Sequence, residues 1–324
     1  MMQFYKRRDF SELISDTFSF FKENGRNYFR NYLLINGLLL ILLVVLFIFG
    51  YRELFSQIGG DTTGGENYYF QVYFEENRPF LILAIAIVFV LFLATTIISY
   101  SYPVLYMKRL SETGDRNIKA DDILGDIRQN AARFLLFFLG MLFVVTPVAA
   151  LIFAISYQLL AVVIGFFLML LLMPFVLNVV NFLLFDYFHT RKGFFDSLAY
   201  ALRAQFSYPA GREKSPFWKY WGSVMVNYLI INVITSIFTM IPMIIILIRV
   251  FAVADEGGDT NIQNPLEGAI GILFFAVYGI SILVSFLLMN FLFVNAGFMY
   301  YDSRTDLHRK LDLSQIDAIG SNES

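Results

Sequence analysis

The side chains best suited to acid–base or metal chemistry gather in the stretch FDYFHTRKGFF, residues 185–195. Asp186 and His189 are three residues apart, so on a helix they would share one face. An iron or zinc site usually takes two or more histidines with carboxylates. The chain has two histidines, His189 and His308, each at the end of an apolar run, where a solvated or lipid-facing position is expected. A metal shared between their segments is the alternative to this interpretation.

The chain lacks the residues that several other kinds of catalysis require. The chain has no cysteine, which excludes disulfides, thiolate catalysis and Cys-ligated metal centres. The patterns GxxxxGK[ST], HExxH and GxSxG do not occur. A net charge of −2 argues against nucleic-acid binding. We therefore expect no enzyme activity, no catalytic residue, no cofactor and no metal; the alternative enzyme would use Asp186, His189 and Asp302.

Six asparagines lie within the last three predicted spans. Two of them, Asn178 and Asn181, share a helix face. One interpretation is hydrogen bonding between helices, at about 0.6 kcal/mol each in membranes. The other is a polar seam between the fourth, fifth and sixth predicted membrane helices that binds a lipid headgroup or small amphiphile. The candidate ligand-binding residues are Asn178, Asn181, Asn227, Asn232, Asn290 and Asn295.

The elements that must position these residues are membrane helices. The chain is 58% hydrophobic and 15% charged, whereas soluble domains are about 25% charged. Windows 31–51, 79–107, 134–185, 220–248 and 268–301 contain no charged residue. A helix needs about 20 apolar residues to cross a bilayer, so the longest window must fold back. Ser156-Tyr157-Gln158 is the most polar point near its middle, which predicts a hairpin there and six transmembrane helices in all.

The basic residues predict the orientation. Of 24 lysines and arginines, 21 lie in the N-terminal segment, the loops 108–133 and 189–219, and the C-terminal tail. Basic loops stay in the cytoplasm, so we expect a multi-pass protein of the bacterial inner membrane with both termini cytoplasmic.

Three amphipathic stretches predict an internal repeat. They are residues 10–34, 118–136 and 192–206, and each precedes a predicted pair of spans. Apolar residues recur on one helical face in each, as in Phe194, Phe195, Leu198, Leu202 and Phe206. Beside a membrane this pattern suits an interfacial helix. We therefore predict an all-α, single membrane domain over 1–324, built of hairpin units 1–109, 110–190 and 191–310, with a cytoplasmic tail at 302–324.

The longer outer loop, 52–78, carries an unusual aromatic cluster. Its members, which could face a partner, are Tyr68, Tyr69, Phe70, Tyr73 and Phe74. An interfacial position among lipid headgroups is the alternative.

The segments DFSELISDTFSFFKENGRNYFRNY, SYPVLYMKRL, FDYFHTRKGFFDSL and YYDSRTDLHRKLDLSQIDAIG together resemble an uncharacterised six-span inner-membrane protein family of flavobacteria. The resemblance covers essentially the whole chain. Members are sometimes labelled β-carotene 15,15′-monooxygenase, but two histidines at the edges of different spans cannot supply the iron ligands of that reaction. The arrangement is also similar to the membrane domain of some glycerophosphoryl diester phosphodiesterases. The family has no defined catalytic residues, so the resemblance assigns none here.

Together these patterns predict a non-enzymatic membrane protein that serves as a scaffold, assembly or accessory subunit of an envelope complex. Its partners would be the lipid bilayer and either another membrane protein or further copies of itself. The alternative is a transporter or binder of lipids or small amphiphiles that uses the asparagine seam.

Overall fold

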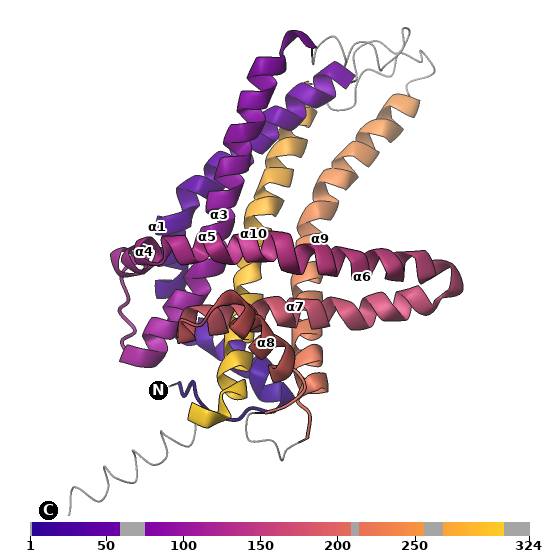
Figure 1. Cartoon of the computed structure of the whole chain (residues 1–324). Coiled ribbons are helices and arrows are strands. Elements are labelled where there is room, and N and C mark those ends of the chain that lie inside the picture. Colours follow the sequence, from indigo (N-terminus) through magenta and orange to yellow (C-terminus); the bar gives the residue numbers. More distant parts are fainter. Residues whose placement is uncertain (1, 59–74, 209–213, 256–267, 308–324) are drawn as a thin grey trace, which may run out of the picture. The chain divides into compact units, whose positions relative to one another are not determined.

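The computed structural model describes residues 2–58, 75–208, 214–255 and 268–307. All regular structure in these residues is helical, as predicted (Figure 1). The helices are α1 (Phe10–Ile58), α3 (Arg78–Thr113), α4 (Ala120–Gln129), α5 (Ala131–Gly140), α6 (Thr146–Gln158), α7 (Ile164–Thr190), α8 (Phe194–Ala204), α9 (Phe217–Asp255) and α10 (Gly268–Ser303). Within the described part of the chain, six helical segments are long and apolar enough to cross a membrane. The predicted membrane class and the number of spans are therefore confirmed.

The amphipathic stretches take two forms. In α1 the stretch and the span that follows form one continuous helix of 49 residues. The other two are short separate helices, α4 and α8, which precede α5 and α9. Asp9 caps α1, since its carboxylate accepts a hydrogen bond from the Glu12 amide at 2.7 Å, and the Asp9 amide donates one to the Glu12 carboxylate at 2.8 Å.

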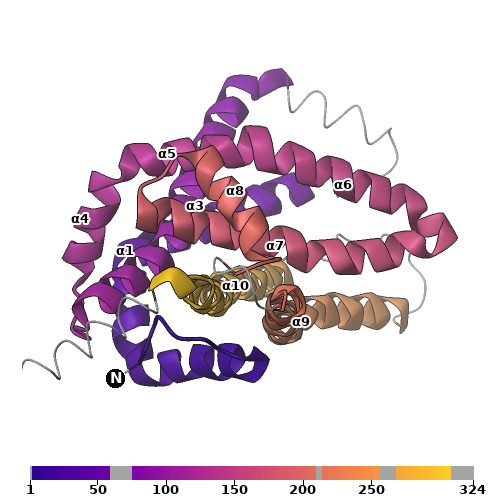
Figure 2. The same cartoon turned by 60° about the horizontal axis from the view of Figure 1, so that its bottom comes forward.

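The predicted hairpin lies at the expected place. A short 3₁₀ turn, Leu159–Val162, joins α6 to α7, and Val163 has the left-handed φ of 63°. Gly165 lets the two helix ends approach, because a Cβ there would collide with the Ser156 carbonyl oxygen. Beyond this turn, α6 and α7 lie side by side (Figures 1 and 2).

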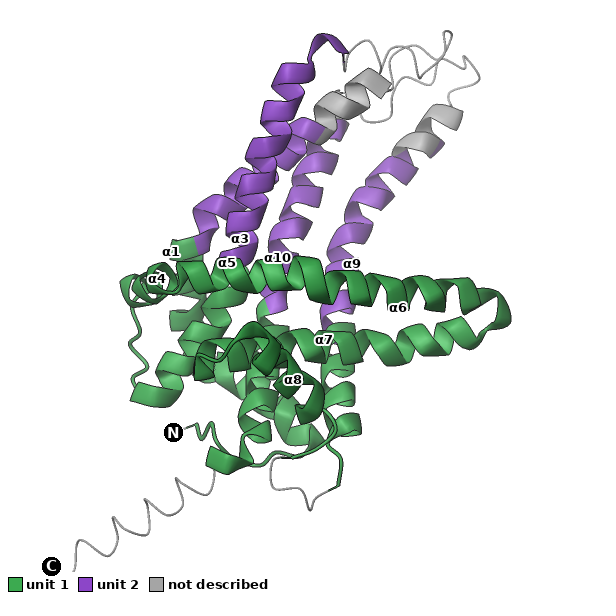
Figure 3. Cartoon of the chain, viewed as in Figure 1, with its two compact units in different colours: residues 1–35, 99–229, 290–324 green, residues 36–98, 230–289 purple. Residues whose placement is uncertain are grey.

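The chain divides into two compact units, drawn in Figure 3. Unit 1 comprises residues 1–35, 99–229 and 290–324, and unit 2 comprises 36–98 and 230–289. Each unit thus combines segments that are far apart in the sequence. The predicted division into three successive hairpin units stays a prediction.

The helices of unit 2 pack against one another through small residues and aromatic rings. A Cβ on Gly279 of α10 would come within 2.6 Å of Val44 of α1, so the missing side chain allows the close approach of these helices. Phe47 and Tyr278 stack nearby with ring centroids 5.7 Å apart. The hydroxyl of Ser281 donates to the Phe238 carbonyl at 3.1 Å, which ties α10 to α9.

Unit 1 has an aromatic core between α1 and α3. Tyr28, Tyr102 and Tyr106 are fully buried, and their rings lie within 6 Å of one another. Each phenol finds an acceptor: Tyr102 bonds the Tyr28 carbonyl at 2.6 Å, Tyr106 bonds Asn27 at 2.9 Å, and Tyr28 bonds Asn290 of α10 at 2.8 Å. Buried tyrosines stabilise a unit in this way only when their hydroxyls are paired.

Candidate functional site

Asp302, at the end of α10, is the centre of a buried polar cluster in unit 1. Its carboxylate accepts hydrogen bonds from the Arg8 amide at 2.6 Å, from Lys219 at 2.5 Å, and from the hydroxyls of Tyr220 at 2.5 Å and Tyr208 at 3.3 Å. Asp302 is fully buried and Lys219 is 17% exposed, so this is a buried ion pair. We call these five residues the Asp302 cluster. It joins the N-terminal segment, the chain after α8, the start of α9 and the end of α10.

The Arg8 side chain fastens the N-terminal segment beside this cluster. Its guanidinium donates to the carbonyls of Phe4 at 2.7 Å and Gln3 at 2.6 Å, and to the Asp16 carboxylate at 2.9 Å. It also lies 4.7 Å from the centre of the Phe298 ring. Burial lowers the pKa of Arg8, and the hydrogen bond and charge of Asp16 oppose that shift.

The Asp–His pair of α7 is built into the helix packing. Asp186 is fully buried, and its carboxylate lies 3.9 Å from Arg304. His189 is half-buried, with Nδ1 3.1 Å from the Phe185 carbonyl and Nε2 2.9 Å from the Tyr301 hydroxyl. The expectation that His189 is solvated or faces lipid is therefore wrong. The sequence pattern shows that His189 ends an apolar run, but not that α10 covers it.

The candidate asparagines are divided between the units. Asn178, Asn181, Asn227, Asn290 and Asn295 belong to unit 1 and are buried, whereas Asn232 is half-buried and belongs to unit 2.

Three of these asparagines have clear partners. Asn295 donates to the Leu13 carbonyl and to Thr17 of α1, both at 3.2 Å, and accepts from Ser223 of α9 at 3.1 Å. Asn290 accepts from Tyr28, and Asn227 donates to the Ser223 carbonyl at 2.9 Å. Asn290 and Asn295 therefore join helices.

The other two asparagines of unit 1 carry unsatisfied atoms. Oδ1 of Asn178 and Nδ2 of Asn181 are buried and have no hydrogen-bond partner among the described residues. Oε1 of Gln205, just after α8, is in the same state. Buried polar atoms are normally paired with protein or ordered water, so these atoms retain bonding capacity for a small polar guest.

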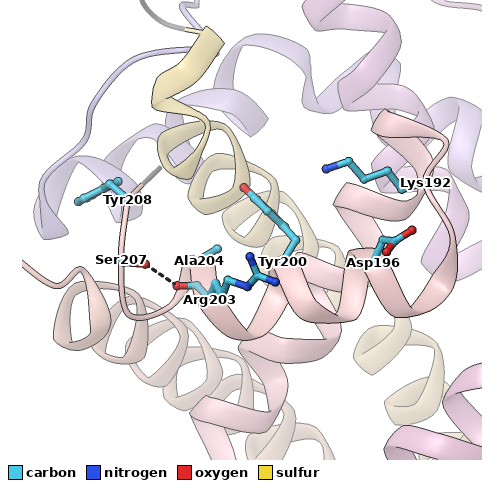
Figure 4. A pocket seen from close by; sticks show the side chains of 7 residues that line it. All are labelled: Lys192, Asp196, Tyr200, Arg203, Ala204, Ser207 and Tyr208. Atoms are coloured by element: carbon cyan, nitrogen blue, oxygen red, sulfur yellow. Dashed lines mark hydrogen bonds between the residues drawn. The ribbon is translucent and has the colours of Figure 1, made fainter. Parts of the chain in front are cut away.

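A cavity of about 490 Å³ lies along α8, within unit 1. It is lined by Lys192, Asp196, Tyr200, Arg203, Ala204, Ser207 and Tyr208 (Figure 4). Lys192, Asp196, Arg203 and Ser207 are exposed, so solvent reaches it. The Tyr200 and Ser303 hydroxyls lie 2.5 Å apart, which ties the cavity wall to α10. Burial raises the pKa of Tyr200 above its ordinary value.

The sequence patterns did not single out the residues that complete these sites. Tyr208, Lys219 and Tyr220 flank the segment SYPAGREKSPFWKYW, whose composition suggests a loop and an interfacial anchor. The one signal is a lysine between aromatic residues at the border of an uncharged run. The aromatic residues of the outer loop, 68–74, and His308 lie outside the described residues. No group of three or more His, Asp or Glu side chains able to hold a metal occurs among the residues that the structure describes.

One family model matches part of the chain. It is described as a protein of unknown function (DUF4013), and it matches residues 194–323, from the first residue of α8 onwards. No curated protein and no solved structure matches the chain. The match is consistent with an uncharacterised membrane protein and adds no activity or ligand.

Proposed function

We propose that this protein is a non-enzymatic integral membrane protein that acts as a scaffold, assembly or accessory subunit of an envelope complex. The observation that carries the proposal is the hairpin of α6 and α7. Within unit 1 this hairpin extends beyond the other helices (Figure 3). We call its outer part, residues 141–173, the arm.

The arm is apolar on all sides, and few of its residues pack against the rest of unit 1. Of its residues, Ser156 and Gly165 are buried. Phe143 and Phe167 are 71% and 64% exposed, as large aromatic side chains. In α7 beyond the arm, by contrast, all residues from 181 to 188 are buried. A helix that is apolar all round needs lipid or other helices around it, so the arm offers a surface for a second membrane protein.

The polar groups of unit 1 support a structural role. The carboxylate of Asp302 accepts four hydrogen bonds from its own chain. His189 contacts a carbonyl and a tyrosine hydroxyl of its own chain. These interactions hold four chain segments in one arrangement, which is what a scaffold requires.

Photo-crosslinking in native membranes tests this function. A photoreactive residue at Phe143 or Phe167 should crosslink to one defined membrane protein, or to a second copy of this chain. The comparison position is Phe80 of unit 2, which is 67% exposed but lies outside the arm, and it should not crosslink to the same protein. Lipid adducts alone at all three positions, with a monodisperse monomer in mild detergent, would contradict the proposal.

The location proposed is the bacterial inner membrane, with both termini in the cytoplasm. The bias of lysine and arginine supports this orientation. Because the chain has no cysteine, single cysteines introduced at Arg116 and Glu76 can be labelled without background. An impermeant maleimide applied from outside the inner membrane should react at position 76 and not at position 116.

The second candidate function is binding of a lipid or small amphiphile at the asparagine seam. The unpartnered atoms of Asn178 and Asn181 favour it. The double substitution Asn178→Leu/Asn181→Leu would then remove co-purifying amphiphile while the protein stays folded. If bound amphiphile is unchanged, this second function is excluded.

A further inference from the structure

The lining of the cavity along α8 contains two cationic side chains, Lys192 and Arg203, and the ring of Tyr200. Lys192 and Arg203 stand near opposite ends of the helix, and both side chains extend toward Tyr200 between them (Figure 4). The Lys192 ammonium lies 5.8 Å from the centre of the Tyr200 ring. No carboxylate in the described part of the chain forms an ion pair with either cation. These cations therefore remain available to an anion from outside the chain.

Asp196 is the one acidic residue of the cavity lining. It lies in the first turn of α8, where a carboxylate stabilises the positive end of the helix dipole. The lining therefore carries two positive charges and one negative charge. This balance favours an anionic guest.

The neighbouring flank of α8 has the apolar pattern of a helix at a membrane surface. Phe195, Leu202 and Phe206 are 69%, 42% and 50% exposed and form an apolar stripe. An exposed stripe of this kind on a short helix lies at the boundary between headgroups and acyl chains. Trp218, 66% exposed at the start of α9, has the side chain that prefers the same depth.

Three residues that line the cavity are the sequence neighbours of residues in the apolar stripe. Asp196, Arg203 and Ser207 each come directly after Phe195, Leu202 and Phe206. One residue turns a helix by about 100°, so Asp196 and Arg203 of α8 lie beside Phe195 and Leu202, whereas Phe206 and Ser207 follow the end of the helix at Ala204. A lipid whose acyl chains contact the stripe therefore brings its headgroup to the cavity.

We propose that the cavity along α8 binds the phosphate of an anionic membrane phospholipid, with Arg203 and Lys192 as its ligands. A guanidinium and an ammonium are the two side-chain cations that bind phosphate. The volume lies in the usual range of ligand sites, about 300–1,000 Å³. This site is separate from the asparagine seam, since none of the six asparagines lines it.

Native mass spectrometry of the full chain in neutral-detergent micelles tests the site. Phosphatidylglycerol should bind, and diacylglycerol, which lacks phosphate, should not. Lys192→Gln/Arg203→Gln should weaken phosphatidylglycerol binding at least about tenfold, because each substitution removes a charge-assisted contact. Ser207→Glu should weaken it similarly by adding a negative charge while both cations remain.

The matched control is Lys119→Gln/Arg128→Gln on α4. These two residues are also exposed cations near the ends of a short amphipathic helix, but they do not line the cavity. Binding should be unchanged in this variant. Equal binding by wild type and Lys192→Gln/Arg203→Gln would overturn the proposal. Competition by glycerol 3-phosphate at the same concentration as the lipid would overturn the membrane source in favour of a soluble phosphate.

Discussion

Substitution Asp302→Ala is expected to destabilise unit 1 strongly. It leaves Lys219, 17% exposed, without its carboxylate, and removes the acceptor of the Arg8 amide and of the Tyr220 and Tyr208 hydroxyls. Removing one partner of a buried ion pair costs about 3–5 kcal/mol, mostly because the other charge is left buried and unpaired. Tyr220→Phe, which removes one hydrogen bond, should cost about 1 kcal/mol.

The same reasoning predicts a partial rescue. In Asp302→Ala/Lys219→Met no buried charge is left without its partner, because the apolar methionine side chain, of similar length, replaces the charged lysine. Replacing a whole buried pair by apolar residues is often close to neutral. The double variant should therefore recover part of the free energy lost in Asp302→Ala, rather than lose more.

Tryptophan fluorescence during unfolding in mixed detergent and SDS micelles measures these differences. Both tryptophans of the chain, Trp218 and Trp221, flank Lys219 and Tyr220 in the sequence and report on this part of unit 1. Circular dichroism provides a second probe that does not depend on the tryptophan environment. A loss of unfolding free energy below about 1 kcal/mol for Asp302→Ala would refute the argument that a buried lysine is left unpaired. A double variant less stable than Asp302→Ala would refute it as well.

Three further outcomes are expected. Gly165→Leu should separate the α6 and α7 ends and destabilise unit 1, because a Cβ there collides with the Ser156 carbonyl; unchanged unfolding by the same fluorescence assay would refute it. Arg8→Ala should make the N-terminal segment cleavable by trypsin at lower protease concentration, since the guanidinium bonds that fasten it are lost. Hydrogen bonds from the Glu12 amide and the Ser11 hydroxyl lower the pKa of Asp9. The ionised Asp9 therefore stabilises the folded state above about pH 4, and this stabilisation is lost as the pH falls through the lowered pKa. Asp9→Asn should flatten that part of the pH profile, and an identical acid profile would contradict the capping role.

Much of the fold could be predicted because the free energy of moving a segment from water into a membrane depends on the residues of that segment alone. Uncharged windows long enough to cross a bilayer predicted six spans, and six candidate spans occur in the described residues. The most polar point of the longest window predicted the hairpin within a few residues of the turn Leu159–Val162. The stripe on α8 could likewise be predicted from its helical period, and its Phe195, Leu202 and Phe206 are exposed.

The candidate sites depended on tertiary structure. Asp302 and Arg8 are 294 residues apart in sequence, and nothing in the local composition pairs them. A polar residue at the border of an apolar run has the same pattern whether it faces water, lipid or another helix. This ambiguity explains why His189 was expected at a solvated or lipid-facing boundary and is instead packed against Tyr301.

Hydropathy thus determined which segments leave water, since that depends on each side chain's own transfer free energy. Which polar groups then satisfy one another depends on helix packing across the whole chain. The tertiary structure alone joined four segments at Asp302 and turned Lys192 and Arg203 toward one tyrosine. Buried donors and acceptors are normally paired, and only the packed arrangement decides which groups supply the partners.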